Sequence, residues 1–93
     1  MIVSFKDAGA RELFETGRSR KIPESIRKAA LRKLTYLDAA GDLSELRAPP
    51  GNRLEALKGD RKGQHSIRIN DQYRICFVWR DHSAHAVEIA DDH

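Results

Sequence analysis

The stretch that decides the fold covers residues 54–79, LEALKGDRKGQHSIRINDQYRICFVW. On either side of Asn70-Asp71, mostly apolar side chains recur at every second position. Before the turn these are His65, Ile67 and Ile69, and after it Tyr73, Ile75, Phe77 and Trp79. A period of two indicates a β-strand, and two such runs around a short polar segment indicate a β-hairpin with a buried apolar face. The other face then carries Ser66, Arg68, Arg74, Cys76 and Val78.

This second face of the hairpin is basic. Arg68 and Arg74 lie in mid-strand, and Lys58 opens the turn KGDRKG of residues 58–63. A guanidinium group held by a strand is a rigid binder for an anionic ligand. We therefore expect the rest of the chain to cover the apolar face or to extend the basic one.

The charges cluster along the chain. Its 93 residues, 40% of them hydrophobic, predict one domain over residues 1–93. Seventeen Lys and Arg stand against fourteen Asp and Glu, for a formal net charge of +3. Between Arg18 and Lys33 the only acid is Glu24, and a second basic run includes Arg47, Arg53, Lys58, Arg61, Lys62, Arg68 and Arg74. Such clustering suits a polyanion such as RNA, and a solvated helix face explains it equally well.

The single cysteine, Cys76, excludes an internal disulfide and fits a reducing compartment. Its place in an apolar strand predicts a small packed side chain. The N-terminus has no apolar signal region, and no stretch approaches transmembrane length. These features predict a cytoplasmic protein.

The N-terminal half predicts a short strand at Ile2 to Phe5 and two helices. Asp7 is suited to cap the first helix, which ends near Gly17, and Pro23 suits the first turn of the second, which Gly41 stops. The second helix has one apolar stripe of Ile26, Ala30, Leu34 and Leu37. Four basic residues of this helix lie off that stripe: Arg27, Lys28, Arg32 and Lys33. We expect them to face solvent, RNA or a partner.

The C-terminal half predicts an antiparallel sheet. Two prolines followed by Gly51-Asn52 predict an ordered loop, and a strand is expected at 53–57. After the hairpin, a last strand at 84–90 is expected to turn Val87 and Ile89 inward. Strands joined by tight turns pair antiparallel, so the fold class is α+β, with the two N-terminal helices packed on one face of an antiparallel β-sheet.

Several segments together resemble the HigB toxins of the RelE/ParE superfamily, whose members share a RelE-like fold. The resemblance is carried by 57–61 (LKGDR), 63–68 (GQHSIR) and 70–77 (NDQYRICF). The opening MIVSFK, the segment LFETG at 13–17 and the ending DDH at 91–93 agree with it. Because these segments span nearly the whole chain in the family's order, the match is specific.

The resemblance implies endonucleolytic cleavage of mRNA in the ribosomal A site. In this metal-independent reaction the ribose 2′-OH attacks the adjacent phosphorus, cations stabilise the phosphorane, and an acid protonates the leaving 5′-oxygen. Positioning and electrostatic stabilisation supply most of the acceleration. No cofactor and no metal are expected.

The resemblance also indicates the catalytic residues. Arg74 matches the arginine of the family's Asn-x-x-Trp/Tyr-Arg motif and would grip phosphate, although a cross-strand ion pair with Glu55, Glu88 or Asp91 is the structural alternative. Lys58 matches the Leu-Lys-Gly lysine and would neutralise the phosphorane; otherwise it is a solvated turn residue. The terminal His93 aligns with the family's last histidine and would transfer a proton, with Asp91 either orienting it or anchoring the basic residues.

Two positions depart from the family pattern. Asp92 stands where many members have a tyrosine that stacks on a base, which affects RNA binding or codon preference. Glu55 stands where the better-studied branch has a histidine. Two roles are open for Glu55: general base in place of that histidine, or partner of Arg74 or Arg68 in an ion pair.

The remaining candidate residues are expected to contact mRNA or ribosomal RNA: Arg68, Arg61, Lys62, Asn70, Arg27 and Lys28, with Asp71 and Gln72 beside Asn70. For Asn70 and Asp71 the alternative is that the turn requires them for its backbone alone. The implied partners are the ribosome with its mRNA, and a HigA-like helix-turn-helix antitoxin that links the complex to DNA. No membrane partner is expected. Two other functions stay open: a ParE-like inhibitor of DNA gyrase without nuclease activity, and a degenerate toxin that only binds antitoxin or RNA.

Overall fold

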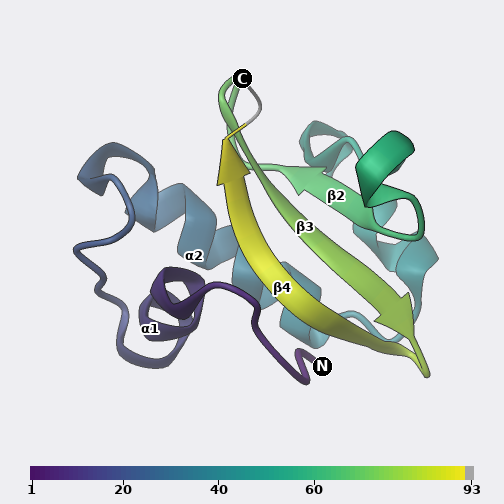
Figure 1. Ribbon diagram of the computed structural model, residues 1–93, viewed down its shortest axis with the longest axis horizontal. Helices are drawn as coiled ribbons and strands as arrows, with labels where there is room; N and C mark the ends of the chain where they lie inside the picture. Colours follow the sequence, from purple (N-terminus) through teal and green to yellow (C-terminus); the bar gives the residue numbers. More distant parts are fainter. Residues whose placement is uncertain (92–93) are drawn as a thin grey trace.

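The computed structural model describes residues 1–91. Two helices, α1 (Ala8–Thr16) and α2 (Glu24–Ala39), come first. Two 3-10 turns, η1 (Leu43–Arg47) and η2 (Pro50–Asn52), lead into strand β1 (Glu55–Ala56), a third turn η3 (Gly59–Arg61), and strands β2 (His65–Arg68), β3 (Tyr73–Arg80) and β4 (Ser83–Asp91). In Figure 1, α2 lies behind the sheet, and α1 lies beside β4 near the N-terminus. The α+β prediction, with helices on one sheet face, is confirmed.

The four strands form one antiparallel sheet in the order β1-β2-β3-β4. In the hairpin, Ile67 lies opposite Ile75, and Arg68 lies opposite Arg74. Ile67, Ile75 and Phe77 are fully buried. The predicted hairpin and its apolar face are therefore confirmed, and the basic face points away from the helices.

Helix α1 begins and ends where its capping residues predict. The Asp7 Oδ1 atom accepts a hydrogen bond from the Gly9 amide at 2.9 Å, and Oδ2 accepts one from the Ile89 amide at 3.2 Å. One carboxylate thus satisfies a free amide of the helix and attaches that end to β4. At the other end Gly17 adopts a left-handed φ of 79°, which glycine tolerates at a helix C-terminus.

Helix α2 packs its predicted apolar stripe into the core, together with one charged residue. Ile26, Ala30, Leu34 and Leu37 are all buried. The expectation that Lys33 faces solvent is wrong, because its side chain is 6% exposed and belongs to the edge of the same stripe. Burial lowers the pKa of Lys33, and the nearby Arg32 and Arg68 guanidinium groups lower it further.

Lys33 is accepted in the interior because it has a buried partner. Its Nζ donates to Oδ1 of Asn52, which is fully buried. The Asn52 Nδ2 in turn donates to the carbonyls of Leu46 at 3.1 Å and Ala48 at 3.2 Å. This chain of hydrogen bonds ties the loop of η1 and η2 to α2, so the predicted loop is ordered.

The two edges of the sheet differ from the prediction. At one edge, Arg53 has a left-handed φ of 44°, so the expected strand at 53–57 is shortened to the two residues of β1. At the other edge, Ile2 and Phe5 form isolated parallel bridges with β4 instead of a regular strand. Between these bridges the Ser4 hydroxyl accepts the Ala86 amide at 2.9 Å, beside the β-bulge of β4, where Ala86 has a φ of 51°.

The bulge decides which side chains of β4 enter the core. Ala84 and Val87 are both fully buried although three positions separate them. A regular strand would turn them to opposite faces, and the one extra residue of a bulge restores the match. Val87 faces inward as predicted, and Ile89 packs partly buried against the same core.

Replacing Asn52 tests the buried tie. Asn52→Ala removes the hydrogen bonds that Asn52 makes with the Lys33 ammonium and with two carbonyls, which should lower the free energy of unfolding by about 3 kcal/mol. Chemical denaturation measures the change. Ser44→Ala, an exposed change in the same loop, should stay within about 0.5 kcal/mol of the wild type. An equally small effect of Asn52→Ala would contradict the account.

Candidate functional site

The exposed face of the hairpin holds a hollow of about 200 Å³. Its walls come from β1, β2, β3, the turn between β2 and β3, and Arg53, two residues before β1. We call it the arginine hollow, and it is lined by Arg53, Glu55, Ser66, Arg68, Asn70, Asp71, Tyr73 and Arg74. Three guanidinium groups and two carboxylates share this small space. The hollow therefore has an excess of positive charge.

The cross-strand register places the arginines side by side. Arg68 and Arg74 are direct partners in the β2–β3 pair, and like charges placed opposite each other repel. Arg74 Nη1 donates to Ser66 Oγ at 3.3 Å and lies 3.6 Å from Glu55 Oε1. Arg68 forms an ion pair with Asp71 across the turn. The structure thus contains the ion pair between Arg74 and Glu55, which was one of the two roles predicted for Glu55.

Both ion pairs are open to solvent on the acidic side. The Glu55 side chain is 54% exposed and that of Asp71 is 98% exposed. Exposed pairs of this kind contribute about 0–1 kcal/mol, so an incoming phosphate can replace the carboxylates at little cost. Arg74 itself is only 24% exposed. The arrangement suits a site in which fixed arginines exchange weak carboxylate partners for a doubly hydrogen-bonded phosphate.

Three residues that line the arginine hollow were not among the site residues predicted from the sequence. Ser66 shares a strand face with Arg68, and this alternation was a usable signal. Tyr73 was assigned to the core, and it does pack against the core cluster while also lining the hollow. No pattern in the sequence indicated that Arg53 belongs to the site, because its position depends on the left-handed turn before β1.

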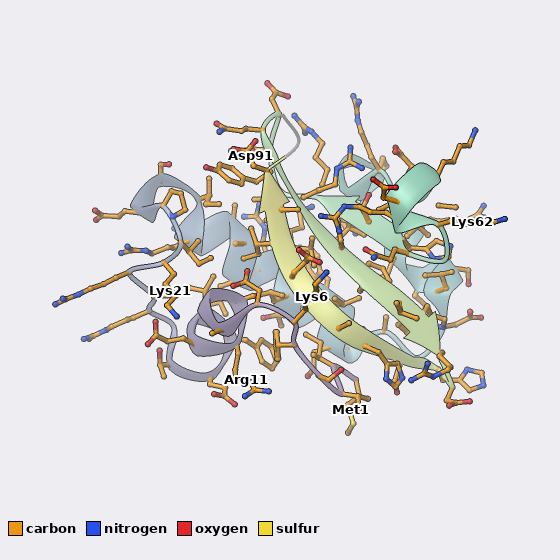
Figure 2. All side chains as sticks on the ribbon, in the orientation of Figure 1. Met1, Lys6, Arg11, Lys21, Lys62 and Asp91 are labelled. Carbon is orange, nitrogen blue, oxygen red and sulfur yellow. The ribbon has the colours of Figure 1, made fainter. Side chains whose placement is uncertain are left out.

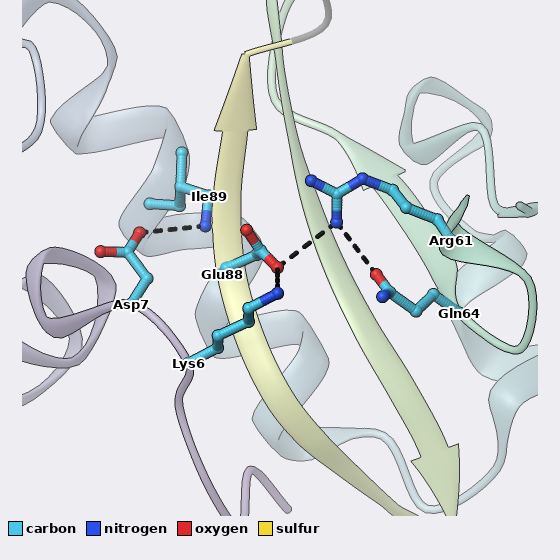
Figure 3. A network of polar contacts seen from close by, with 6 residues as sticks. All are labelled: Lys6, Asp7, Arg61, Gln64, Glu88 and Ile89. Carbon is cyan, nitrogen blue, oxygen red and sulfur yellow. Dashed lines mark hydrogen bonds and ion pairs between the residues drawn. The ribbon is translucent and has the colours of Figure 1, made fainter. Parts of the chain in front are cut away.

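A second polar network crosses the same face of the sheet (Figure 3). Arg61, at the end of η3, donates from Nη1 to Glu88 Oε2 on β4 at 3.3 Å and to Gln64 Oε1 at 3.1 Å. Lys6 Nζ lies 3.5 Å from the same Glu88 oxygen. The hydrogen bond to Glu88 raises the pKa of Arg61. Glu88 therefore fastens η3 over the sheet, and η3 begins directly after Lys58.

Comparison with known proteins now assigns the family. Residues 3–93 match a family described as the RelE-like toxin of the type II toxin-antitoxin system HigB. The chain belongs to this family. It is 51% identical over 82 residues to "Toxin HigB-1" of Vibrio cholerae serotype O1, covering 87% of this chain and 86% of that protein. It is 33% identical over 93 residues to "Endoribonuclease HigB" of Proteus vulgaris, covering 100% of both.

Family membership confirms the expected resemblance and makes the chain a toxin with an antitoxin partner. The α+β arrangement of two helices and a four-stranded antiparallel sheet is consistent with the RelE-like fold. Neither helix in residues 1–91 has the length and apolar character needed to cross a membrane.

The candidate residues fall into distinct groups on the RelE-like scaffold. Those in the arginine hollow are Glu55, Arg68, Asn70 and Arg74. Those at η3 are the exposed Lys58, Arg61 and the exposed Lys62. Figure 2 shows Lys62 at the side of the molecule away from Lys21. Their roles in RNA binding and catalysis stay predictions.

The C-terminal candidates lie at the end of β4. Asp91 is the register partner of Tyr73, one position from the pair of Arg74 with Ala90, and it accepts a hydrogen bond from Gln72 Nε2 at 3.1 Å. Figure 2 shows Asp91 at the end of the sheet. His93 and Asp92 lie outside the described residues.

Arg27 and Lys28 lie on α2, outside the hollow. Arg27 is half-buried, and its Nε donates to the Ile22 carbonyl at 2.8 Å, whereas Lys28 is exposed. The Arg27 contact ties the start of α2 to the linker before it. Within residues 1–91 the Lys28 ammonium makes no hydrogen bond to the backbone, so its charge is the more accessible of the two.

Removing the Glu88 charge tests whether this residue fastens η3. Glu88→Gln should lower the free energy of unfolding by about 1 kcal/mol, because a charged hydrogen bond becomes a neutral one. Amide hydrogen exchange at residues 58–64 should speed up more than elsewhere. Lys6→Gln is the matched control, since Lys6 is 64% exposed and should change neither quantity. Unchanged exchange at 58–64 in Glu88→Gln would contradict the assignment.

Proposed function

We propose that the protein cuts messenger RNA within the translating ribosome, in the cytoplasm, and that the arginine hollow binds the phosphate at the cleavage point. One observation carries the proposal: fixed guanidinium groups surround an open hollow in a chain whose full-length relative in Proteus vulgaris is named an endoribonuclease. The exposed Asp71 and Glu55 pair only weakly with Arg68 and Arg74, which supports exchange of these acids for RNA phosphate.

The chemistry is attack of the ribose 2′-OH on the adjacent phosphorus. A base takes the 2′ proton as the new O–P bond forms, and the bond from phosphorus to the 5′-oxygen breaks as an acid returns a proton to that oxygen. Arg74 binds a non-bridging oxygen through its Nη1 edge and stabilises the charge of the phosphorane. Its donors are held by Ser66 and Glu55 in the free protein, so little reorganisation is needed.

The other roles follow from position and charge. Glu55 forms an ion pair with Arg74, so it is placed to take the 2′ proton once phosphate has replaced it as the partner of Arg74. Lys58 adds positive charge from the start of η3. His93 is the proposed acid for the leaving oxygen, and Asp91 is proposed to orient it. These side chains supply proton transfer and charge stabilisation without a metal.

The partners of this function follow from the family and from charge. The antitoxin is proposed to be a HigA-like helix-turn-helix protein, and DNA is reached only through that complex. Arg68, Asn70, Arg61, Lys62, Arg27 and Lys28 are proposed to contact mRNA or ribosomal RNA. Basic groups of this kind set affinity and orientation without reading sequence.

Mapping of mRNA ends in cells tests the nuclease function. We expect induction of the wild type to produce cuts in phase with codons inside translated regions, and Arg74→Ala at matched protein level to produce none. Arg80→Ala is the matched control, because Arg80 belongs to the same strand, is 65% exposed and lies outside the hollow. It should cut like the wild type.

The chemical groups at the new ends of the cleaved mRNA test the mechanism. Attack by the 2′-OH leaves a 2′,3′-cyclic phosphate on the upstream fragment and a 5′-OH on the downstream one, so the new 5′ ends should accept phosphate from a kinase without prior dephosphorylation. New ends that carry a 5′-phosphate would contradict this mechanism. Growth arrest without new mRNA ends would contradict the nuclease function itself, and a gyrase supercoiling assay would then test the ParE-like alternative.

A further inference from the structure

Arg53 has an unusual backbone and an unusual position. It is an arginine with φ 44° and ψ 56°, in the left-handed region that glycine and asparagine occupy most cheaply. It lines the arginine hollow, and it also lines a larger groove of about 560 Å³ beneath the β1 edge of the sheet. We call this second space the edge groove. Arg53 therefore stands where the two spaces meet.

The fold holds the Arg53 backbone from one side. Asn52 directly precedes it and is fixed by Lys33 and by the Leu46 and Ala48 carbonyls. The Arg53 amide donates to the Pro50 carbonyl at 3.2 Å, and β1 begins two residues later. A left-handed non-glycine residue persists when its surroundings determine it in this way. The turn thus presents the Arg53 side chain at one fixed point on the sheet edge.

The Arg53 guanidinium differs from its two neighbours in having no acid. Arg74 has Glu55 and Arg68 has Asp71, but Arg53 makes no hydrogen bond or ion pair through its side chain with any residue in 1–91. The residue itself is exposed. The turn would form at least as easily around glycine, and within residues 1–91 the arginine side chain adds no hydrogen bond or ion pair. Its charge is therefore available to a ligand.

Taken with the proposed function, on which it rests, the geometry points to Arg53 as a second phosphate-binding residue. We infer that it holds the mRNA backbone phosphate next to the one bound by Arg74, as the strand leaves the arginine hollow toward the edge groove. Arg47, also in the wall of that groove, continues the positive charge along the same path. The ligand chemistry is a phosphodiester, read by charge and geometry and not by base.

Purified ribosomes programmed with a defined mRNA provide the test. Arg53→Gly should lower kcat/KM for cleavage about tenfold, mainly through KM, while Arg53→Lys keeps most of it. The slope of log kcat/KM against log salt should become shallower by about 0.7 in Arg53→Gly, the value for one phosphate on a single strand. Arg11→Ala, which removes an exposed arginine of α1, is the matched control and should change neither.

A folding defect is separated by thermal denaturation. Because glycine fits the left-handed conformation, Arg53→Gly should melt at the wild-type temperature or above it. A tenfold loss of kcat/KM with the wild-type salt slope would overturn the inference, since a lost phosphate contact must release fewer counterions. Equal kcat/KM for Arg53→Gly and wild type would overturn it too.

A neutral linkage identifies which RNA supplies the phosphate. A methylphosphonate at one position beside the cleavage point of the mRNA should slow the wild type about tenfold and should not slow Arg53→Gly further. If no position in the mRNA behaves in this way, the contact is with ribosomal RNA and the inference is wrong. If the wild type fails to cut unmodified mRNA at all, it is the proposed function that fails.

Discussion

The antiparallel register of β2 and β3 sets Arg68 directly opposite Arg74, where their positive charges repel. The register cannot slip to relieve this repulsion, because Ile67 and Ile75 pair on the buried face of the same strands. A shift by one residue would bring the charged face into the core and the apolar face into solvent. The apolar face thus fixes the position of the arginines, and solvent-exposed acids compensate for them only in part.

Several other features of the structure maintain this exposed basic face. Helix α2 covers the apolar face, and Asp7 attaches α1, which lies beside β4, to that strand through the Ile89 amide. Glu88 holds η3 over the sheet through Arg61, and Asn52 holds the loop before β1 through Lys33. Each of these contacts joins segments far apart in the sequence. Together they leave one open basic surface beside a closed core.

Local pattern in the sequence was enough for much of this fold. The alternation around Asn70-Asp71 predicted the hairpin and its two faces, and the spacing from Ile26 to Leu37 predicted the buried side of α2. Patterns of this kind fail where one distant contact decides the outcome. Lys33 is buried because Asn52, nineteen residues on, accepts a hydrogen bond from its ammonium group. The bulge at Ala86 reverses the faces of β4, which alternation alone does not reveal.

The site was predictable to a similar degree. Glu55, Arg68, Asn70 and Arg74 follow from the strand pattern and the family motifs, and the structure brings them into one hollow. Arg53 could not be predicted, because only a left-handed turn placed by buried hydrogen bonds brings it there. It was visible in the sequence only as one more basic residue.

The central claim is that Arg74 is kept for its ligand and not for the fold. Arg74→Met, which keeps an unbranched apolar side chain similar to the aliphatic part of arginine and removes the charge, tests it by pairing chemical denaturation with ribosomal cleavage. The account predicts a free energy of unfolding equal to the wild type or higher, because the repulsion with Arg68 is gone, and no cleavage. A variant that loses more than about 1 kcal/mol of stability and still cuts mRNA would contradict it.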